Sequence, residues 1–234
     1  MCASCSRRSL ISGAIATLVL GTRISDAAVE DHRIMCGFKD EEFRSYRNSM
    51  TSSSGDSKFD SALISELKLI LQVIPVDPGF KYVKADNASA TNETIVSGTK
   101  GTVLIGLDFV NKLVKKDEGG ISVAGVLAHE CAHIFQYFSV YHGRLKGPTN
   151  RLIELHADLL AGYYMAKKLG SAGVRLSPLQ QTFIQIGTYN DLDERNHGTP
   201  GQRNAALDKG YLLSLRGISF EDAAREGEDY VRGL

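Results

Sequence analysis

A long apolar segment of this chain carries two histidines four residues apart. His129 and His133 flank Glu130 in a His-Glu-x-x-His pattern within residues 121–138. The segment has no proline, and its apolar side chains recur at spacings of three and four residues, which predicts a half-buried helix. On that helix the two histidines lie one turn apart on one face, with Glu130 at the edge of this face.

This pattern has a specific chemical interpretation. Two imidazoles one helical turn apart can bind a single zinc ion, and the neighbouring carboxylate can act as general base towards a zinc-bound water. The competing interpretation is a surface helix that carries two unrelated histidines. Cys131 lies inside the pattern but on the opposite face, with Leu127 and Ile134. We therefore predict Cys131 to be a small core residue and not a metal ligand.

A second segment offers the third ligand. Residues 151–168 have helical spacing, and Glu154 and Asp158 within them are four apart, so that they share a helix face. We predict Glu154 to be the third zinc ligand. We predict Asp158 to be the carboxylate that orients a ligand histidine through its free N–H. His156 lies on another side of the helix and is predicted to be a packed histidine, not a ligand.

The two motifs together resemble those of the gluzincin zinc metallopeptidases. The His-Glu-x-x-His pattern followed by Glu154-Leu-x-Ala-Asp158 is similar to that of the CAAX prenyl protease and heat-shock membrane protease group, and to that of a group of bacterial neutral zinc metallopeptidases. The segment from His197 to Arg203 resembles a His and Arg motif that these families carry after the third-ligand helix. The resemblance covers residues 85–211. The chain departs from the membrane members, because no transmembrane helix flanks the motif.

The resemblance implies an α+β, zincin-like metallopeptidase domain, with a small mixed sheet packed on the active-site helix and the third-ligand helix. It implies one Zn²⁺ per chain and hydrolysis of peptide bonds in a protein or peptide substrate. Glu130 would take the proton of the attacking water and pass it to the leaving amine. His197 is the predicted donor to the oxyanion, and Arg203 the predicted partner of a carboxylate. A loop histidine and a surface salt-bridge arginine are the open alternatives.

One further segment has a counterpart in the resembling families. Asn87, Ala88 and Ala90 belong to an Asn-Ala-Ser-Ala sequence between predicted strands. In those families a similar segment marks the sheet edge beside the active site, where an extended peptide could add as a further strand. A simple polar loop is the alternative.

The rest of the chain predicts short strands and several capped helices in a single domain without internal repeats. Alternation predicts the strands, and apolar periodicity with capping residues predicts the helices. The predicted strands are 80–85, 94–97 and 102–107; the predicted helices are 59–74 and 108–116, with Asp108 as cap, and three that start near Ser177, Thr199 and Ser219. Residues 143–150 are predicted to form a loop, with His142 in solvent at the helix end.

Residues 1–27 have the parts of an export signal: the pair Arg7-Arg8, a short apolar run and small residues near the end. The arginine pair resembles a twin-arginine signal. We therefore expect an exported protein, periplasmic or secreted if it is bacterial, with no stable membrane span after cleavage. An uncleaved segment that anchors the chain is the alternative. Residues 28–57 form a polar segment, which could be a pro-segment, and residues 58–234 the metallopeptidase domain.

The charge and the cysteine content bear on the partners and the redox state that we expect. The formal net charge is zero, which gives no support to a nucleic-acid or anionic-membrane partner. After signal cleavage only Cys36 and Cys131 remain, and we expect two free thiols because Cys131 faces the core. His32 is predicted to be a surface histidine. A catalytically silent zincin-fold binding or regulatory protein of the cell envelope is the alternative function.

Overall fold

The computed structural model describes residues 35–36, 40–116, 120–170, 176–186 and 197–234. Residues 33–234 group into one compact unit. The predicted export signal, residues 1–27, and His32 lie outside the described residues. None of the helices in the described ranges combines the length and the apolar character that crossing a bilayer requires.

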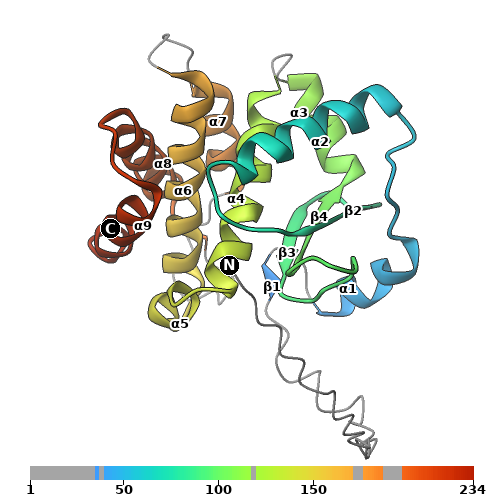
Figure 1. The fold of residues 1–234 in the computed structure, drawn as a ribbon, viewed down its shortest axis with the longest axis horizontal. Helices are drawn as coiled ribbons and strands as arrows, with labels where there is room; N and C mark the ends of the chain where they lie inside the picture. Colours follow the sequence, from blue (N-terminus) through green and yellow to red (C-terminus); the bar gives the residue numbers. More distant parts are fainter. Residues whose placement is uncertain (1–34, 37–39, 117–119, 171–175, 187–196) are drawn as a thin grey trace, which may run out of the picture. The chain divides into compact units, whose positions relative to one another are not determined.

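A small mixed sheet lies on one side of the unit (Figure 1). Its strand order in the described part of the chain is β1-β3-β4-β2, where β2 and β4 pair in parallel and β3 is antiparallel to both of its neighbours. The strands are β1 (Met35–Cys36), β2 (Gly79–Val83), β3 (Ala88–Thr91) and β4 (Thr102–Gly106). Aromatic and β-branched residues such as Tyr82, Val103 and Ile105 favour β2 and β4.

Helices make up most of the remaining described residues. They are α1 (Asp40–Tyr46), the 3-10 helix η3 (Arg47–Ser49), α2 (Ser57–Leu71), α3 (Leu107–Lys116), α4 (Ile121–Tyr137), α5 (Tyr141–Leu145), α6 (Arg151–Leu169), α7 (Ser177–Ile186), α8 (Pro200–Leu215) and α9 (Phe220–Arg232). Side-chain caps start several of them: Asp56 caps α2, Thr199 and Gln202 form a capping box at α8, and Ser219 caps α9.

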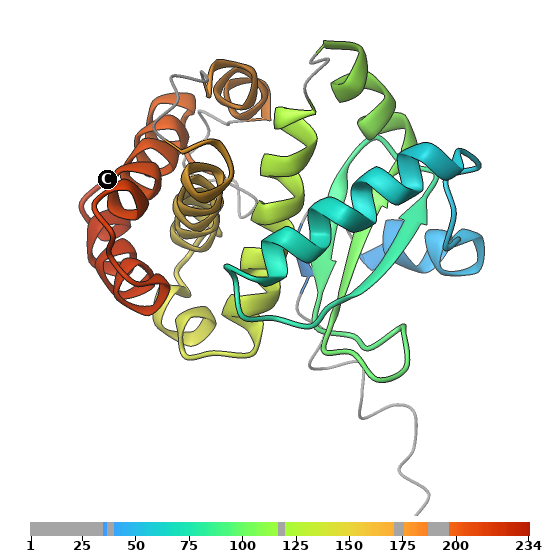
Figure 2. The same cartoon turned by 45° about the horizontal axis from the view of Figure 1, so that its top comes forward.

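The helices are layered on the sheet. α4 lies between the sheet and α6, and α8 and α9 pack on α6 (Figures 1 and 2). As a result α4 and α6 are buried on nearly all sides, and their charged residues at the centre are buried with them. The prediction that the His-Glu-x-x-His helix is only half buried was therefore wrong.

Two glycines allow α6 and α8 to approach closely. A Cβ atom at Gly162 would overlap the carbonyl of Leu207, and one at Gly210 would overlap the carbonyl of Leu159. Only a residue without a side chain fits a helix contact of this kind. The pair of glycines thus sets the distance between α6, which carries Glu154, and the helix behind it.

Several predicted elements are confirmed, and others are corrected. Strands 80–85 and 102–107 correspond to β2 and β4 within two residues, but residues 94–97 form no strand. The Thr102 hydroxyl accepts the Ile95 N–H and donates to the Glu93 carbonyl, so a side chain takes the place of a strand partner there.

Smaller corrections concern helix ends. Asp108 does not cap α3, which already begins at Leu107, but lies in its first turn. The first predicted helix, 59–74, ends at Leu71. The predicted loop 143–150 begins inside the short helix α5.

The described residues of the polar segment 28–57 pack with the rest of the domain. β1 pairs with β3, and Thr51 exchanges two backbone hydrogen bonds with Tyr82. Phe43 of α1 is fully buried against Val83 and Leu104. These residues therefore belong to the same compact unit as the predicted metallopeptidase domain.

Candidate metal centre

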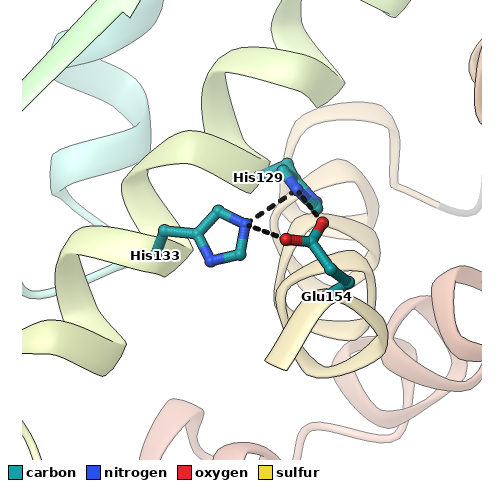
Figure 3. A group of neighbouring side chains, drawn as sticks. All are labelled: His129, His133 and Glu154. Atoms are coloured by element: carbon teal, nitrogen blue, oxygen red, sulfur yellow. Dashed lines mark hydrogen bonds and ion pairs between the residues drawn. The ribbon is translucent and has the colours of Figure 1, made fainter. Parts of the chain in front are cut away.

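Three side chains from two helices converge on one point between α4 and α6 (Figure 3). The His129 Nε2 and His133 Nε2 atoms lie 3.0 Å apart. The Glu154 carboxylate from α6 lies 3.4 Å from His129 Nε2 through one oxygen and 3.5 Å from His133 Nε2 through the other. All three side chains are buried, and their ligand atoms lie within 4.8 Å of one another. This buried group could hold a metal ion.

The outer nitrogen of each imidazole has its own partner. His129 Nδ1 lies 2.8 Å from Asp158 Oδ1, and His133 Nδ1 lies 2.8 Å from Gln136 Oε1. Both partners can accept a hydrogen bond, so the neutral form of each ring that fits this arrangement has its hydrogen on Nδ1 and a lone pair on Nε2. Asp158 thus lies where the sequence places it, whereas Gln136 was not identified from the sequence.

These contacts provide a chemical test of whether a metal fits. Two Nε2 lone pairs and a carboxylate oxygen facing one another repel unless a cation lies among them. A zinc ion bound by two imidazoles and one carboxylate satisfies this requirement, and the ligand types match those of catalytic zinc sites. In the metal-free protein, a proton on one of these groups has to reduce the repulsion instead.

The electrostatics of the cluster agree with that requirement. Burial alone would lower the pKa of His129, but the hydrogen bonds to Asp158 and Glu154 outweigh it and raise the pKa to about 10. Burial likewise opposes ionisation of Glu154, but His197 and His133 hold the pKa of its carboxyl well below the usual value. The cluster therefore keeps a carboxylate and attracts positive charge.

Glu130 lies beside the cluster, and its pKa is shifted in the opposite direction to that of Glu154. Its side chain is buried, and no described residue forms a hydrogen bond with its Oε2 atom. Burial raises the pKa of Glu130, although the nearby histidines act against this effect. The pKa of Glu130 is therefore higher than that of an exposed glutamate.

A buried ion pair supports the cluster from behind. Arg203 of α8 donates to both oxygens of Asp158, with two distances of 2.7 Å, and both side chains are fully buried. The guanidinium also lies 4.5 Å from the ring centroid of Phe183 in α7. Arg203 thus fixes Asp158, and through it the His129 ring.

His197 lies beside Glu154, the third candidate ligand. Its Nδ1 atom is 2.9 Å from Glu154 Oε2, and its side chain is 28% exposed, more than any of the three candidate ligands. It precedes α8, whose capping box at Thr199 sets the direction of the chain there. The structure therefore brings His197 to the candidate metal centre, where its side chain is partly exposed.

A cavity of about 310 Å³ opens onto the cluster. His129, Glu130, Glu154, His197 and Arg203 contribute to its walls. The described residues 40–57 are not among its lining residues, so no described part of the polar segment covers it.

The remaining walls combine apolar and polar groups. Phe109, Val126 and Phe183 are the large apolar lining residues, and Asn87 and Ala88 lie at the same cavity. A molecule in this cavity would therefore meet both apolar and polar surface.

The predicted open edge at Ala90 is wrong. Ala90 and Thr91 of β3 already pair with Cys36 and Met35 of β1, because the polar segment returns to the sheet. The Tyr137 hydroxyl also donates to the Ala90 carbonyl. Asn87 and Ala88 line the cavity, but a substrate strand could not pair with β3 at Ala90 without displacing β1.

The other singled-out residues have packing roles. Cys131 is a fully buried, free thiol, and burial raises its pKa; the side chain of Cys36 is not described. His156 is fully buried, as predicted. His142, predicted to lie in solvent, is partly buried in α5 against the Tyr137 ring, and burial lowers its pKa.

Comparisons of the chain with protein-family models, with curated proteins and with solved structures found no match. Evidence on function therefore comes from the residues of the site. A functional interpretation has to explain the buried group of His129, His133 and Glu154, and the adjoining cavity that Glu130, with its raised pKa, also lines.

Proposed function

We propose that this chain is a zinc-dependent metalloendopeptidase with a zincin-like domain. The observation that carries the proposal is the convergence of His129, His133 and Glu154 on one point at a cavity that Glu130 also lines. Helices α4 and α6 side by side, with a sheet on the other side of α4, agree with such a domain. The resemblance of the motifs to those of the gluzincins also supports it.

Each residue of the cluster has a role in this proposal. His129, His133 and Glu154 would hold the zinc ion, and three protein ligands leave a coordination position open. Zinc in such a site supplies a Lewis acid that polarises a carbonyl and lowers the pKa of water. Asp158 and Arg203 keep the His129 ring in one orientation.

Glu130 is the proposed general base and acid. Its pKa is raised by burial, so the carboxylate can accept a proton from the attacking water and release it again. The released proton goes to the nitrogen of the leaving amine. Glu154, with its lowered pKa, stays ionised throughout and serves as a ligand.

His197 is the proposed donor to the oxyanion of the tetrahedral intermediate. Its Nδ1 atom lies 2.9 Å from Glu154 Oε2, so the other ring nitrogen, Nε2, is the one that would donate to the oxyanion.

The test is zinc content and cleavage for the purified wild type, Glu130→Gln and Glu154→Ala. We expect about one zinc per wild-type chain and chelator-sensitive cleavage of casein or a peptide library. Glu154→Ala should lose the zinc, whereas Glu130→Gln should keep it and lose roughly 10²–10⁴-fold in kcat. Full activity of Glu130→Gln, or zinc binding unchanged in Glu154→Ala, would contradict the proposal.

The cellular setting follows from the N-terminus. We infer an exported, periplasmic or secreted enzyme that acts on proteins or peptides, because residues 1–27 have the pattern of a twin-arginine signal. Mass spectrometry of the mature N-terminus tests this inference. An intact Met1 on a membrane-bound chain would favour the anchored alternative.

A further inference from the structure

A chain of buried hydrogen bonds leads from one zinc ligand to the last helix. His133 Nδ1 lies 2.8 Å from Gln136 Oε1, and Gln136 Nε2 lies 2.8 Å from the Ile153 carbonyl and 3.0 Å from His156 Nδ1. His156 Nε2 lies 2.9 Å from the Ala224 carbonyl in α9. His133, Gln136 and His156 are fully buried. This series of hydrogen bonds therefore connects α4, α6 and α9 through side chains that are all buried.

The direction of every hydrogen bond in this chain follows from its two ends. The carbonyls of Ile153 and Ala224 can only accept. The end of the Gln136 side chain next to Ile153 is therefore its NH₂ group, and His156 carries its hydrogen on Nε2. His156 Nδ1 is then a lone pair that accepts the second N–H of Gln136.

The oxygen of the Gln136 amide determines the tautomer of His133. With both hydrogens of Gln136 donated, its oxygen faces His133 Nδ1 and accepts from it. His133 then carries its hydrogen on Nδ1, which leaves Nε2 as the lone pair that points at Glu154 and His129. This is the tautomer that a zinc ligand bound through Nε2 requires.

The His156 ring is held tightly in place. Tyr141 stacks on it with ring centroids 5.0 Å apart. Gly227 of α9 leaves space for the ring, since a Cβ atom there would lie only 3.2 Å from its Cδ2 atom. The carboxylate of Asp158 can accept a hydrogen bond through either oxygen. The amide of Gln136 has only one acceptor oxygen, so it needs a partner such as His156 to fix its orientation.

We propose that Gln136, held by His156, is a positioning residue that fixes His133 in its zinc-binding tautomer. The inference rests on the zinc site proposed above. The two ligand histidines would thus be oriented by different means, one through the Asp158–Arg203 ion pair and one through an amide and a neutral imidazole.

The first test reads the tautomers directly. Two-bond ¹H–¹⁵N correlation spectra of the wild type, metal-free and loaded with zinc, distinguish the protonated nitrogen of each ring. We expect His156 to carry its hydrogen on Nε2 in both forms, and zinc-loaded His133 to carry its hydrogen on Nδ1. A hydrogen on His156 Nδ1, or zinc bound through His133 Nδ1, would overturn the proposal.

The second test compares zinc affinity, by competition with a chromophoric chelator, with thermal stability. Gln136→Met removes the acceptor and should weaken zinc binding about 10–100-fold. Gln136→Glu keeps an acceptor for His133 but loses both donors, so it should lower the melting temperature and keep zinc affinity within a few-fold. A structural role alone predicts that zinc affinity follows stability in both variants.

A matched control removes a partly buried hydrogen bond elsewhere on α6. Tyr164→Phe loses the contact with Glu66 and should lower stability while zinc affinity stays the same. Wild-type affinity in Gln136→Met, or equal losses in Gln136→Met and Gln136→Glu, would overturn this proposal alone. No zinc binding by the wild type would overturn the proposed function and this inference together.

Discussion

The two glutamates of the cavity, Glu130 and Glu154, differ in the protonation state that their surroundings favour. Both are buried, but three histidines keep Glu154 ionised, whereas burial dominates at Glu130 and raises its pKa. Environments that push two carboxyl groups apart in this way are typical of sites that assign one group to charge and another to proton transfer. For these two residues, therefore, neighbours and not residue type distinguish the proposed ligand from the proposed base.

The raised pKa of His129 predicts that zinc competes with a proton. Its pKa of about 10 in the metal-free protein means that the ring is protonated over the neutral range. Zinc binding at pH 8 should therefore release about one proton from this ring, and apparent affinity should rise about tenfold per pH unit up to about pH 10. Calorimetry in buffers of different ionisation enthalpy measures the released protons. Affinity that does not change between pH 7 and pH 9 would contradict the prediction.

The Asp158–Arg203 pair predicts a large cost when one partner is removed. Arg203→Leu leaves the buried Asp158 carboxylate with His129 alone and should destabilise the metal-free protein by about 3 kcal/mol or more. Denaturant unfolding measures this change. The double variant with Asp158→Asn should lose less than the sum of the two single variants, because the buried pair is removed as a unit. Strict additivity would show that the pair does not act as one.

At the scale of elements, the close contact of α6 and α8 determines where Glu154 and Arg203 can meet their partners. Glu154 and Asp158 are on α6, and Arg203 is on α8. Gly162 and Gly210 bring these two helices together at the carbonyls of Leu207 and Leu159. The site thus depends on helix packing away from the cavity.

Gly162→Ala should therefore be severely destabilising. The new methyl group would overlap the backbone of α8, which has to move, at a cost of at least about 2 kcal/mol. Gly143→Ala in α5 is the matched control, because a Cβ atom there meets nothing within 4 Å. The control should be neutral or stabilise by up to about 1 kcal/mol. Thermal unfolding of both variants measures the difference, and equal stability of the two would contradict the packing role of Gly162.

At the scale of the whole compact unit, the metal centre lies between layers and not at their surface. α4 has the sheet on one side and α6 on the other, so a metal held by both helices connects the two halves of the unit. Binding at such a place favours the folded state over the unfolded chain. Metal binding and global stability are therefore expected to be coupled.

Zinc should accordingly raise the melting temperature of the wild type. Free zinc at a thousand times its Kd stabilises a folded state that alone binds it by about 4 kcal/mol. Glu154→Ala should lose most of this increase, since it removes the ligand from α6. Differential scanning calorimetry with and without zinc measures it. An equal increase in Glu154→Ala would place the binding site elsewhere.

Local spacing made the central part of the site predictable. His129 and His133 share a helix face, as do Glu154 and Asp158, because four residues make about one helical turn. The starts of α8 and α9 were predictable from capping residues for the same reason, since a cap acts within three residues. Helix geometry alone accounts for these predictions.

Long-range packing decided the rest. The hydrogen bond from His156 to Ala224 spans 68 residues of sequence, and the one from Gln136 to His156 spans 20. No local sequence pattern therefore predicts them. The return of β1 to the edge of β3 and the burial of α4 on both sides depend in the same way on which elements become neighbours. Residue types and their spacing were thus enough to identify the side chains that could bind a metal. The partners and the protonation of these side chains could not be predicted in this way, because they depend on groups that folding brings together and removes from water.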